Sequence, residues 1–176
     1  MRSFNLIIST FRFAEEDAED ESLDLLEDFG DGNAESEISE VSGLVLCSTT
    51  LDPFYVTEKM AEIIRTEPWR IRFILRAIPI EQIVETNADL ISNNSYLLSQ
   101  KKMTQTDTFR ITIEKRHCHT LSSNEIITSV ASRIPNKVKL IEPDWTVLIE
   151  IIGKRTGISV LKEVQIFSSM KEKRGR

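Results

Sequence analysis

The chain has 176 residues, 40% of them hydrophobic, which is enough for one or two small globular domains. No stretch reaches the roughly 18 to 20 uninterrupted apolar residues of a membrane span, and the first apolar run is too short for a secretory signal, so the expected location is the cytoplasm. The net charge is −6, but residues 1–66 carry sixteen Asp/Glu against four Lys/Arg, whereas residues 67–176 carry twelve against eighteen. Such asymmetry indicates that the two halves have different partners, and a local basic surface suits a phosphate-rich one.

The beginning of the chain predicts a strand, a helix and a hairpin. The apolar run Phe4 to Thr10 predicts the strand. Residues 14–28 place apolar side chains at near-helical spacing among many carboxylates, which predicts a helix with an acidic outer face, and residues 30–33 end it. Residues 34–42 and 44–49, separated by Gly43, predict the hairpin.

A second helix and a strand complete the first domain. Asp52 is a predicted N-cap before Pro53, and apolar residues then follow at helical spacing up to Pro68. Residues 69–78 alternate apolar residues with Arg70, Arg72 and Arg76, which predicts a strand with a basic face. This βαββαβ order predicts a ferredoxin-like domain over residues 1–79.

The remaining residues, 80–176, predict a second domain of the α/β type, so the fold class of the chain is α+β. Residues 79–86 are interpreted as the boundary, and a helix follows over about 90–102. Residues 109–116 predict a strand, and Ser122 with Glu125 forms a capping box that starts a helix. Residues 138–141, 147–152 and 158–161 predict three more strands, with the turn Lys154-Arg155 before the last one.

The sequence lacks the motifs of most enzyme classes. No glycine loop that binds phosphates is present, so no nucleotide cofactor is expected. His117-Cys118-His119 has metal-binding residue types, but adjacent side chains at a strand end point in alternating directions and no second Cys/His cluster exists, so neither a metal site nor a Cys/His catalytic pair is predicted. Cys47 and Cys118 are interpreted as reduced thiols.

Charged and aromatic residues allow more than one interpretation. Glu150 lies within an apolar run, so it is expected either to face solvent at a sheet edge or to pair with a cation such as Lys162. Trp69 and Trp145 are expected to pack against strands rather than to stack on bases.

Basic residues gather in the strand 109–116, in the turn Lys154-Arg155 and in a tail that contains Lys171, Lys173, Arg174 and Arg176. Each alone can be a solvated charge, but guanidinium groups suit phosphate oxygens, and as a group these residues indicate a nucleic-acid surface.

Four short segments of the sequence, taken in order, resemble those of a known family. Residues 108–116, 143–145, 149–153 and 157–161 resemble the THUMP domain, a small tRNA-binding module, and residues 87–173 resemble it as a whole. The preceding residues resemble the ferredoxin-like domain that commonly precedes THUMP in tRNA-modifying proteins. The sequences of these four segments are similar to those of the stand-alone archaeal and eukaryotic branch of the family, which is linked to N4-acetylcytidine in tRNA.

The resemblance implies a function and a set of site residues. It implies that the second domain binds the acceptor end of tRNA, and that the protein is an adaptor for a separate acetyltransferase and not an enzyme. Other THUMP proteins continue into a catalytic domain, whereas this chain ends at Arg176, which favours the adaptor. The RNA-binding residues that it implies in the matching segments are Arg110, Lys115, Arg116, Ser122, Ser123, Lys154, Arg155, Ser159 and Lys162, and Arg76 of the first domain is a further candidate.

Two alternatives stay open. The chain can be the RNA-binding subunit of a split tRNA thiolation or methylation enzyme, with Cys118 carrying sulfur. It can also be a protein-interaction module that uses its acidic first helix, although a solvated face explains that helix equally well.

Overall fold

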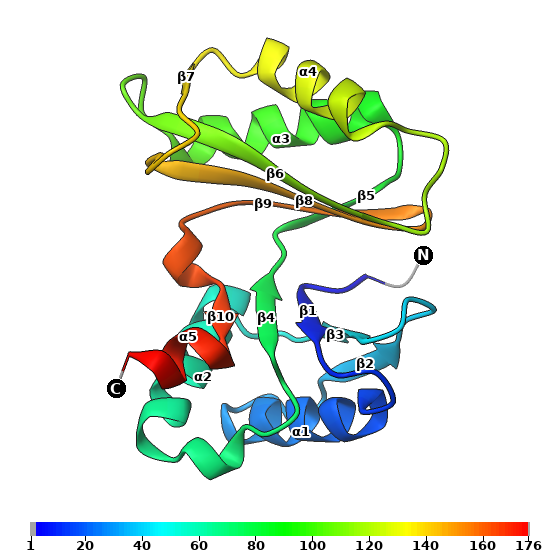
Figure 1. Ribbon diagram of the computed structural model, residues 1–176, viewed down its shortest axis with the longest axis vertical. Coiled ribbons are helices and arrows are strands. Elements are labelled where there is room, and N and C mark those ends of the chain that lie inside the picture. The colour runs from blue at the N-terminus through cyan, green and yellow to red at the C-terminus, as the bar shows by residue number, and fades with distance from the viewer. Residues whose placement is uncertain (1–2, 176) are drawn as a thin grey trace. The chain divides into compact units, whose positions relative to one another are not determined.

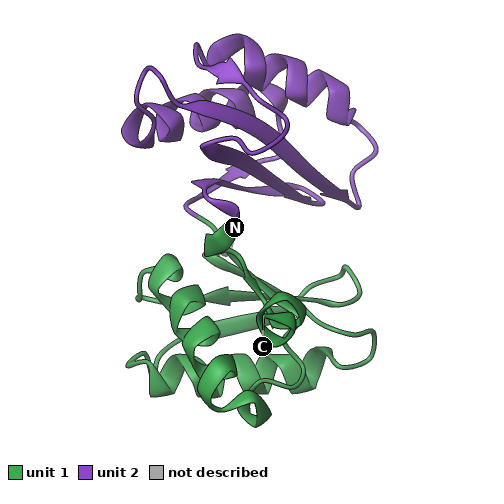
Figure 2. Ribbon diagram, turned by 60° about the vertical axis from the view of Figure 1, so that its left-hand side comes forward, with its two compact units in different colours: residues 1–80, 164–176 green, residues 81–163 purple. Residues whose placement is uncertain are grey.

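The chain forms two compact units in a computed structural model that describes residues 3–175. Unit 1 consists of residues 1–80 and 164–176, and unit 2 of residues 81–163 (Figure 2). The sequence analysis divides the chain after residue 79 and assigns all later residues to the second domain. In the structure the first division follows Ile80, and the chain returns to unit 1 at Val164. Arg176 of the basic tail lies outside the described residues.

Unit 1 is an antiparallel sheet with helices (Figure 1). Its first elements follow the predicted order: β1 (Leu6–Ser9), α1 (Glu15–Asp28), β2 (Glu35–Ile38), β3 (Leu44–Ser48), α2 (Pro53–Thr66), the 3-10 helix η1 (Pro68–Arg70) and β4 (Arg76–Pro79). After unit 2, the chain adds β10 (Phe167–Ser168) and α5 (Ser169–Arg174). The strand order is β10-β4-β1-β3-β2, and all neighbouring strands are antiparallel.

The core of unit 1 lies between one face of this sheet and the helices α1 and α2. Leu6 and Ile8 of β1 pack with Leu26 of α1 and Met60 of α2, and Phe167 of β10 completes the same core. Full burial of a side chain of this size stabilises the fold by about 2 kcal/mol. The Asp52 side chain accepts a hydrogen bond from the backbone N–H of Phe54 at 2.9 Å, which confirms the predicted N-cap of α2.

The predicted strand over residues 69–78 is wrong for most of its length. Only β4 forms a strand there, and the residues before it belong to η1 or to a loop. The backbone N–H groups of Arg72, Phe73 and Ile74 donate to the carboxylate of Glu21 in α1 at 2.7, 3.0 and 2.9 Å. Because these donors bind a side chain, they do not bind a neighbouring strand, and the predicted basic strand face does not exist.

Unit 2 is a mixed sheet with two helices. Its elements are β5 (Gln82–Glu85), α3 (Ala88–Lys102), β6 (Thr108–Arg116), α4 (Ser123–Arg133), β7 (Lys137–Val138), β8 (Trp145–Ile152) and β9 (Arg155–Leu161), and the 3-10 helix η2 (Glu163–Gln165) follows. The strand order is β5-β9-β8-β6-β7, in which β6 is parallel to β7 and β8, and β9 is antiparallel to β8 and β5. β5 lies in the segment interpreted as a boundary, so the sequence analysis missed it. The α+β fold class is confirmed.

Helices α3 and α4 cover one face of this sheet (Figure 1). Ile91 of α3 and Val130 of α4 pack in the same core as Phe109 of β6 and Val147 of β8. No helix among residues 3–175 is long and apolar enough to cross a membrane.

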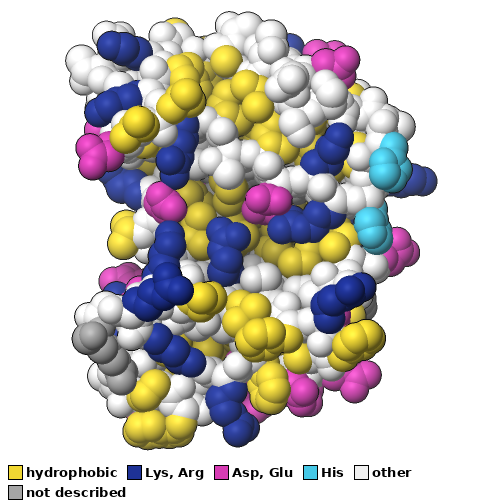
Figure 3. All heavy atoms as spheres, in the orientation of Figure 1, with side chains coloured by type: hydrophobic (Ala, Val, Ile, Leu, Met, Phe, Trp, Pro, Cys, Tyr) yellow, Lys and Arg dark blue, Asp and Glu magenta, His cyan; other side chains and the backbone are white. Residues whose placement is uncertain are grey.

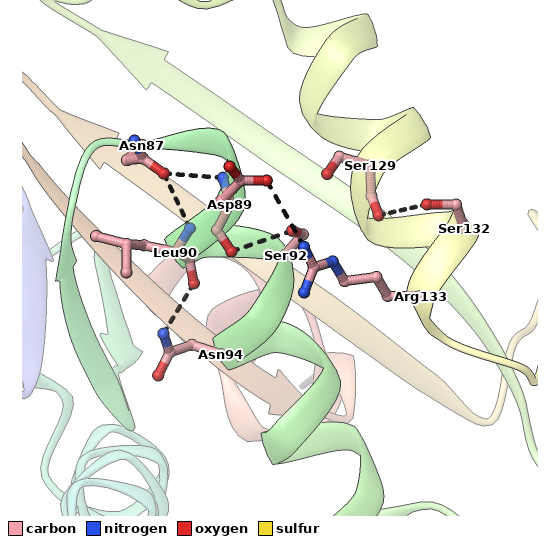
Figure 4. A network of polar contacts seen from close by, with 8 residues as sticks. All are labelled: Asn87, Asp89, Leu90, Ser92, Asn94, Ser129, Ser132 and Arg133. Atoms are coloured by element: carbon pink, nitrogen blue, oxygen red, sulfur yellow. Dashed lines mark hydrogen bonds and ion pairs between the residues drawn. The ribbon is translucent and has the colours of Figure 1, made fainter.

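Polar contacts join the two helices near the start of α3 (Figure 4). The Asn87 side chain accepts hydrogen bonds from the backbone N–H groups of Asp89 and Leu90 at 2.9 and 3.1 Å, so it caps the helix. Asp89 also forms an ion pair with Arg133, in the last turn of α4, at 3.6 Å. The Asn87 cap fixes where α3 begins, and the ion pair joins α3 to α4.

Candidate nucleic-acid interface

Unit 2 is nearly neutral as a whole. Residues 81–163 contain eleven Lys/Arg and ten Asp/Glu, a net charge of +1. Most of the positive excess of residues 67–176 therefore comes from segments that belong to unit 1. The face of unit 2 drawn in Figure 3 nevertheless shows more Lys and Arg than Asp and Glu side chains. A basic surface on this unit thus depends on which cations the fold brings together.

Arginine side chains from two strands lie at one end of the sheet, where β6 and β8 end and β9 begins. Arg116, the last residue of β6, is the register partner of Ile152, which is in turn the partner of Arg155, the first residue of β9. Cross-strand partners share a face of the sheet, and two strand spacings place the two arginine Cα atoms on the order of 10 Å apart. The fold therefore brings together cations that are 39 positions apart in the sequence.

A tight turn sets this arrangement. The backbone N–H of Gly153 donates to the carbonyl oxygen of Arg116 at 2.9 Å, which holds the turn against the end of β6. Gly153 has a φ of +59°, a conformation that glycine adopts without strain. Lys154 follows it and is exposed. The predicted turn is confirmed, although Arg155 already belongs to β9.

The start of α4 joins the same end of the sheet. Lys115 Nζ donates to the carbonyl oxygen of Leu121 at 2.9 Å, which ties the loop after β6 to the strand. The Ser122 hydroxyl accepts a hydrogen bond from the backbone N–H of Glu125 at 3.1 Å, and the Glu125 carboxylate accepts one from the N–H of Ser122 at 3.4 Å. The predicted capping box is confirmed, and Ser123 opens a helix whose N-terminus carries a partial positive charge. We call Lys115, Arg116, Ser122, Ser123, Lys154 and Arg155 the turn cluster.

A buried carboxylate orients one cation of the turn cluster. Glu150 is 1% exposed, and its Oε2 lies 2.6 Å from Nη1 of Arg116. Of the two alternatives for Glu150, exposure to solvent is wrong and pairing with a cation is confirmed, and Arg116 supplies the cation. Lys162, the cation named from the sequence, lies over the indole ring of Trp145 at the start of β8, 4.6 Å from the ring centroid.

Two further predicted residues lie at the opposite end of the sheet. Arg110 precedes Arg116 by six residues along β6, which corresponds to about 20 Å. It forms an ion pair with Glu163 at 2.9 Å. Lys162 lies near the same end with Trp145, whose Nε1 donates to the Asp107 carboxylate at 3.1 Å. Trp145 packs against the core of unit 2, as predicted.

The pKa of Asp107 reflects these contacts at the opposite end. The backbone N–H of Thr104 and the indole N–H of Trp145 hold the pKa of the Asp107 carboxyl below its usual range. Asp107 therefore stays charged and keeps the Trp145 ring in place beneath Lys162.

The last two predicted residues belong to neither group. Ser159 lies within β9, is fully buried, and its hydroxyl accepts a hydrogen bond from the backbone N–H of Glu81 at 3.1 Å. Arg76 is exposed on β4 of unit 1. The structure thus brings together six of the ten residues that the sequence analysis selected.

The loop that follows β6 adds residues considered earlier only as metal ligands or as a Cys/His catalytic pair. His117 and His119 are exposed next to the turn cluster, whereas Cys118 is buried in the core of unit 2. Among residues 3–175, no group of three or more His, Cys, Asp or Glu side chains is placed to hold a metal ion. Both histidines follow directly after the basic end of a predicted strand. This position in the sequence could have indicated that their side chains lie on the surface beside the turn cluster.

The thiols differ in their chemical environment. Burial raises the pKa of the Cys47 thiol to about 12. Burial also acts to raise the pKa of Cys118, but hydrogen bonds with the backbone of Leu121 and the side chain of Thr120 outweigh it and lower the pKa below the usual range. Both cysteines are free thiols.

Comparison with known structures shows the fold of the chain. PH1313 from Pyrococcus horikoshii Ot3 superposes with a TM-score of 0.64 at 16% identity, over 94% of this chain and 55% of that one. TrmN from Thermus thermophilus gives 0.63 at 16%, over 92% and 46%. A 4-thiouridine synthetase in complex with RNA and ATP gives 0.61 at 12%, over 94% and 42%. The chain spans about half the length of these proteins, and at such identities the likeness concerns the fold alone.

Comparison of sequences identifies part of the chain. No curated protein matches it. The family model of the THUMP domain matches residues 85–161, from the last residue of β5 to the last residue of β9. This range contains the whole turn cluster and both helices of unit 2. The chain therefore contains a THUMP domain, at residues 85–161.

Proposed function

We propose that the chain is a tRNA-binding adaptor that presents tRNA to a separate acetyltransferase for the formation of N4-acetylcytidine. The observation that carries the proposal is the turn cluster, a group of cations and a helix N-terminus at one end of the sheet of a THUMP domain. On this proposal unit 1 is the ferredoxin-like domain that accompanies THUMP, neither unit is catalytic, and the protein acts in the cytoplasm.

The turn cluster offers the groups that phosphates require. Arg155 and Lys154 supply charge at the turn, and the buried Glu150 holds the guanidinium plane of Arg116 in one orientation. The start of α4 adds the partial positive charge of a helix N-terminus, which the Glu125 carboxylate of the capping box offsets in part. The RNA backbone is therefore expected to approach the end of the sheet, where its unpaired acceptor end can be recognised by shape.

The basic residues at the opposite end extend this surface. The separation of about 20 Å between Arg110 and Arg116 corresponds to about seven base-pair steps of an A-form RNA helix, at about 2.8 Å per step. One acceptor stem is long enough to contact both ends of the sheet. Arg110 and Lys162 are then secondary contacts, whose loss weakens binding less than loss of the turn cluster.

Binding of labelled tRNA, followed by fluorescence anisotropy, tests the RNA surface. The double variant Lys154→Ala/Arg155→Ala is expected to weaken binding about tenfold or more and to reduce the slope of log K against log salt by about two, because two phosphate contacts are lost. Intact tRNA is expected to bind more tightly than tRNA that lacks its 3′ end.

A matched control removes the same charge elsewhere in unit 2. Lys101→Ala/Arg133→Ala changes exposed side chains in the last turns of α3 and α4. It is expected to bind tRNA like the wild type. Equal losses in the two double variants would show that the turn cluster is not the RNA site.

Nucleoside analysis of tRNA tests the adaptor role. Cells that lack the protein are expected to lose N4-acetylcytidine and to keep their other modified nucleosides, and the wild-type chain is expected to restore it. The purified chain with tRNA and acetyl-CoA is expected to form no N4-acetylcytidine until the acetyltransferase is added. Product formed by the chain alone would contradict the adaptor role.

A second candidate is the RNA-binding subunit of a split tRNA thiolation or methylation enzyme. The observation that favours it is the lowered pKa of the Cys118 thiol, because the thiolate is the reactive form. Cys118→Ser then abolishes a modification without weakening tRNA binding. Normal modification by this variant, or loss of N4-acetylcytidine alone in cells that lack the protein, argues against it.

A further inference from the structure

Unit 1 contains a cleft of about 360 Å³ between α1 and the segment that follows α2. Three aspartates, Asp17, Asp20 and Asp24, line it from α1, and their spacing of three and four residues places them along one face of the helix. Trp69 of η1 and Phe73 line the opposite wall. The cleft therefore combines an acidic wall with an aromatic one.

The two walls are held together by hydrogen bonds and an ion pair. The Glu21 carboxylate of α1 accepts the three backbone N–H groups at residues 72–74, described above. Arg70 forms an ion pair with Asp28 at the end of α1. The cleft is thus preformed, and a ligand does not have to order it.

The charges that line the cleft are not balanced within the protein. Arg70 is engaged by Asp28, and the guanidinium of Arg72 lies over the Phe73 ring, 5.6 Å from its centroid. By contrast, the three aspartates are exposed and form no hydrogen bond or ion pair within residues 3–175. A ligand that enters the cleft meets three uncompensated carboxylates.

Trp69 supplies a large surface that is not used for folding. Its side chain is 68% exposed, although the sequence analysis expected it to pack against strands. An indole ring is the aromatic surface on which an arginine or lysine cation binds best. Tryptophan is also enriched among the residues that dominate protein interfaces.

We propose that this cleft docks an arginine- or lysine-rich segment of another protein. The cations of the segment pair with Asp17, Asp20 and Asp24, and the stem and head group of one of them lie on the Trp69 ring. Nucleic acid is a poor occupant because the three carboxylates repel phosphates. The docking surface of unit 1 is therefore separate from the proposed tRNA surface of unit 2, and it does not depend on that proposal.

The full-length chain and a labelled peptide in which arginine alternates with leucine test the docking surface. We expect saturable binding that weakens with salt. A peptide with glutamate in place of arginine is expected not to bind. Trp69→Ala and the triple variant Asp17→Asn/Asp20→Asn/Asp24→Asn are each expected to weaken binding of the arginine peptide about tenfold or more.

A second triple variant separates docking from general attraction to an acidic unit. Glu35→Gln, Glu40→Gln and Glu58→Gln remove the same charge from exposed positions outside the cleft. This variant is expected to bind the arginine peptide like the wild type. If it weakens binding as much as the aspartate variant does, or if Trp69→Ala binds normally, the docking surface is refuted.

Titration of the same variants with tRNA distinguishes the two classes of partner. Trp69→Ala and the aspartate variant are expected to keep the tRNA affinity of the wild type. A loss of tRNA affinity in Trp69→Ala would make Trp69 an RNA contact and overturn the docking surface. Failure of the tRNA proposal alone leaves peptide binding unchanged, so the two proposals fail independently.

Discussion

Glu150 is a carboxylate in the middle of an apolar strand, and Arg116 neutralises its charge at 2.6 Å. Arg116→Ala is expected to destabilise unit 2 by about 3 kcal/mol, because a buried charge that loses a partner is costly. Urea unfolding followed by circular dichroism measures this change in the free energy of unfolding.

The ion pair between Arg133 and Asp89 provides the comparison for Arg116. These side chains are 41% and 88% exposed and lie 3.6 Å apart. Arg133→Ala is expected to change stability by less than about 1 kcal/mol, since solvent screens surface pairs. A loss as large as that in Arg116→Ala would mean that burial does not determine the contribution of the Arg116 pair.

Asp31 makes the stability of unit 1 sensitive to acid. Its carboxylate accepts hydrogen bonds from the Thr49 hydroxyl at 2.6 Å and from the backbone N–H of Thr50 at 2.7 Å, which connects the end of α1 to the end of β3. These bonds hold the pKa of Asp31 below its usual range. They therefore stabilise the fold above the unfolded-state pKa of about 4, and the stabilisation is lost as the pH falls through the lower folded-state pKa.

The variant Asp31→Asn tests this dependence. Its stability deficit relative to the wild type is expected to be largest near neutral pH and to shrink as the pH falls below about 4, in urea unfolding at a series of pH values. Asp24→Asn removes an exposed carboxylate of the preceding helix α1 and is expected to keep the acid sensitivity of the wild type. A constant deficit of Asp31→Asn at all pH values would contradict the assigned role.

The elements that were predicted correctly are those whose determinants are local. The capping box at Ser122 and Glu125 and the N-cap at Asp52 act within one helical turn, so the sequence reveals them directly. Residues 69–78 alternate like a strand, but Glu21, about fifty positions away, takes the backbone donors of that segment. β5 was missed because four residues between a proline and a helix carry little pattern of their own.

The candidate site divides in the same way. Arg116, Lys154 and Arg155 were selected from their positions in the region that resembles the THUMP domain, and the strand end and the turn that carry them are local features of the sequence. Ser159 lies in the predicted strand 158–161, yet its full burial follows from the pairing of β9 with both β5 and β8, which the local sequence does not show. The carboxylate that orients Arg116 depends on the parallel pairing of β6 with β8, which no local pattern reveals.

Helix α4 allows its structural and functional roles to be separated at one residue. Ser122→Asp keeps an effective N-cap, so the free energy of unfolding is expected to stay within about 0.5 kcal/mol of the wild type. The new carboxylate at the turn cluster repels phosphate, so tRNA binding is expected to weaken about tenfold. Ser122→Ala is the complementary variant: it is expected to lose about 1 kcal/mol of stability and, because it adds no repulsive charge, to weaken tRNA binding less than Ser122→Asp does. Unchanged tRNA binding by Ser122→Asp would place the RNA away from the start of α4.

At the scale of the whole molecule, the charge asymmetry of the sequence halves does not match the two units. Unit 2 has a net charge of +1, whereas the basic residues of the last segment belong to an otherwise acidic unit 1. The THUMP domain has a basic surface because the fold places a few cations together, and not because the domain carries an overall excess of positive charge. On the proposed function, the electrostatic attraction of tRNA to this domain is therefore local.

The return of the chain to unit 1 predicts a selective effect of one core substitution. Phe167 is 2% exposed in the core of unit 1, so Phe167→Ala is expected to destabilise that unit by about 3 to 5 kcal/mol. Amide hydrogen exchange is expected to accelerate about 100-fold or more in β1 and β3 and to stay unchanged in β6 and β8. Val164→Ala, at an exposed position of the same segment, is the control and is expected to change neither unit. Equal acceleration in both sheets would contradict the division into units.

Because β10 pairs with β4 across more than eighty intervening residues, the two units become complete at different times during synthesis. The ribosome produces all of residues 81–163 before Phe167, so unit 2 can finish folding while β4 still presents an open sheet edge. Nascent chains arrested with Glu163 just outside the ribosome are expected to contain a protease-resistant unit 2 and a protease-sensitive unit 1. Equal resistance of both units would show that β10 is not needed for the first sheet. The last strand to emerge thus determines when the first domain becomes stable.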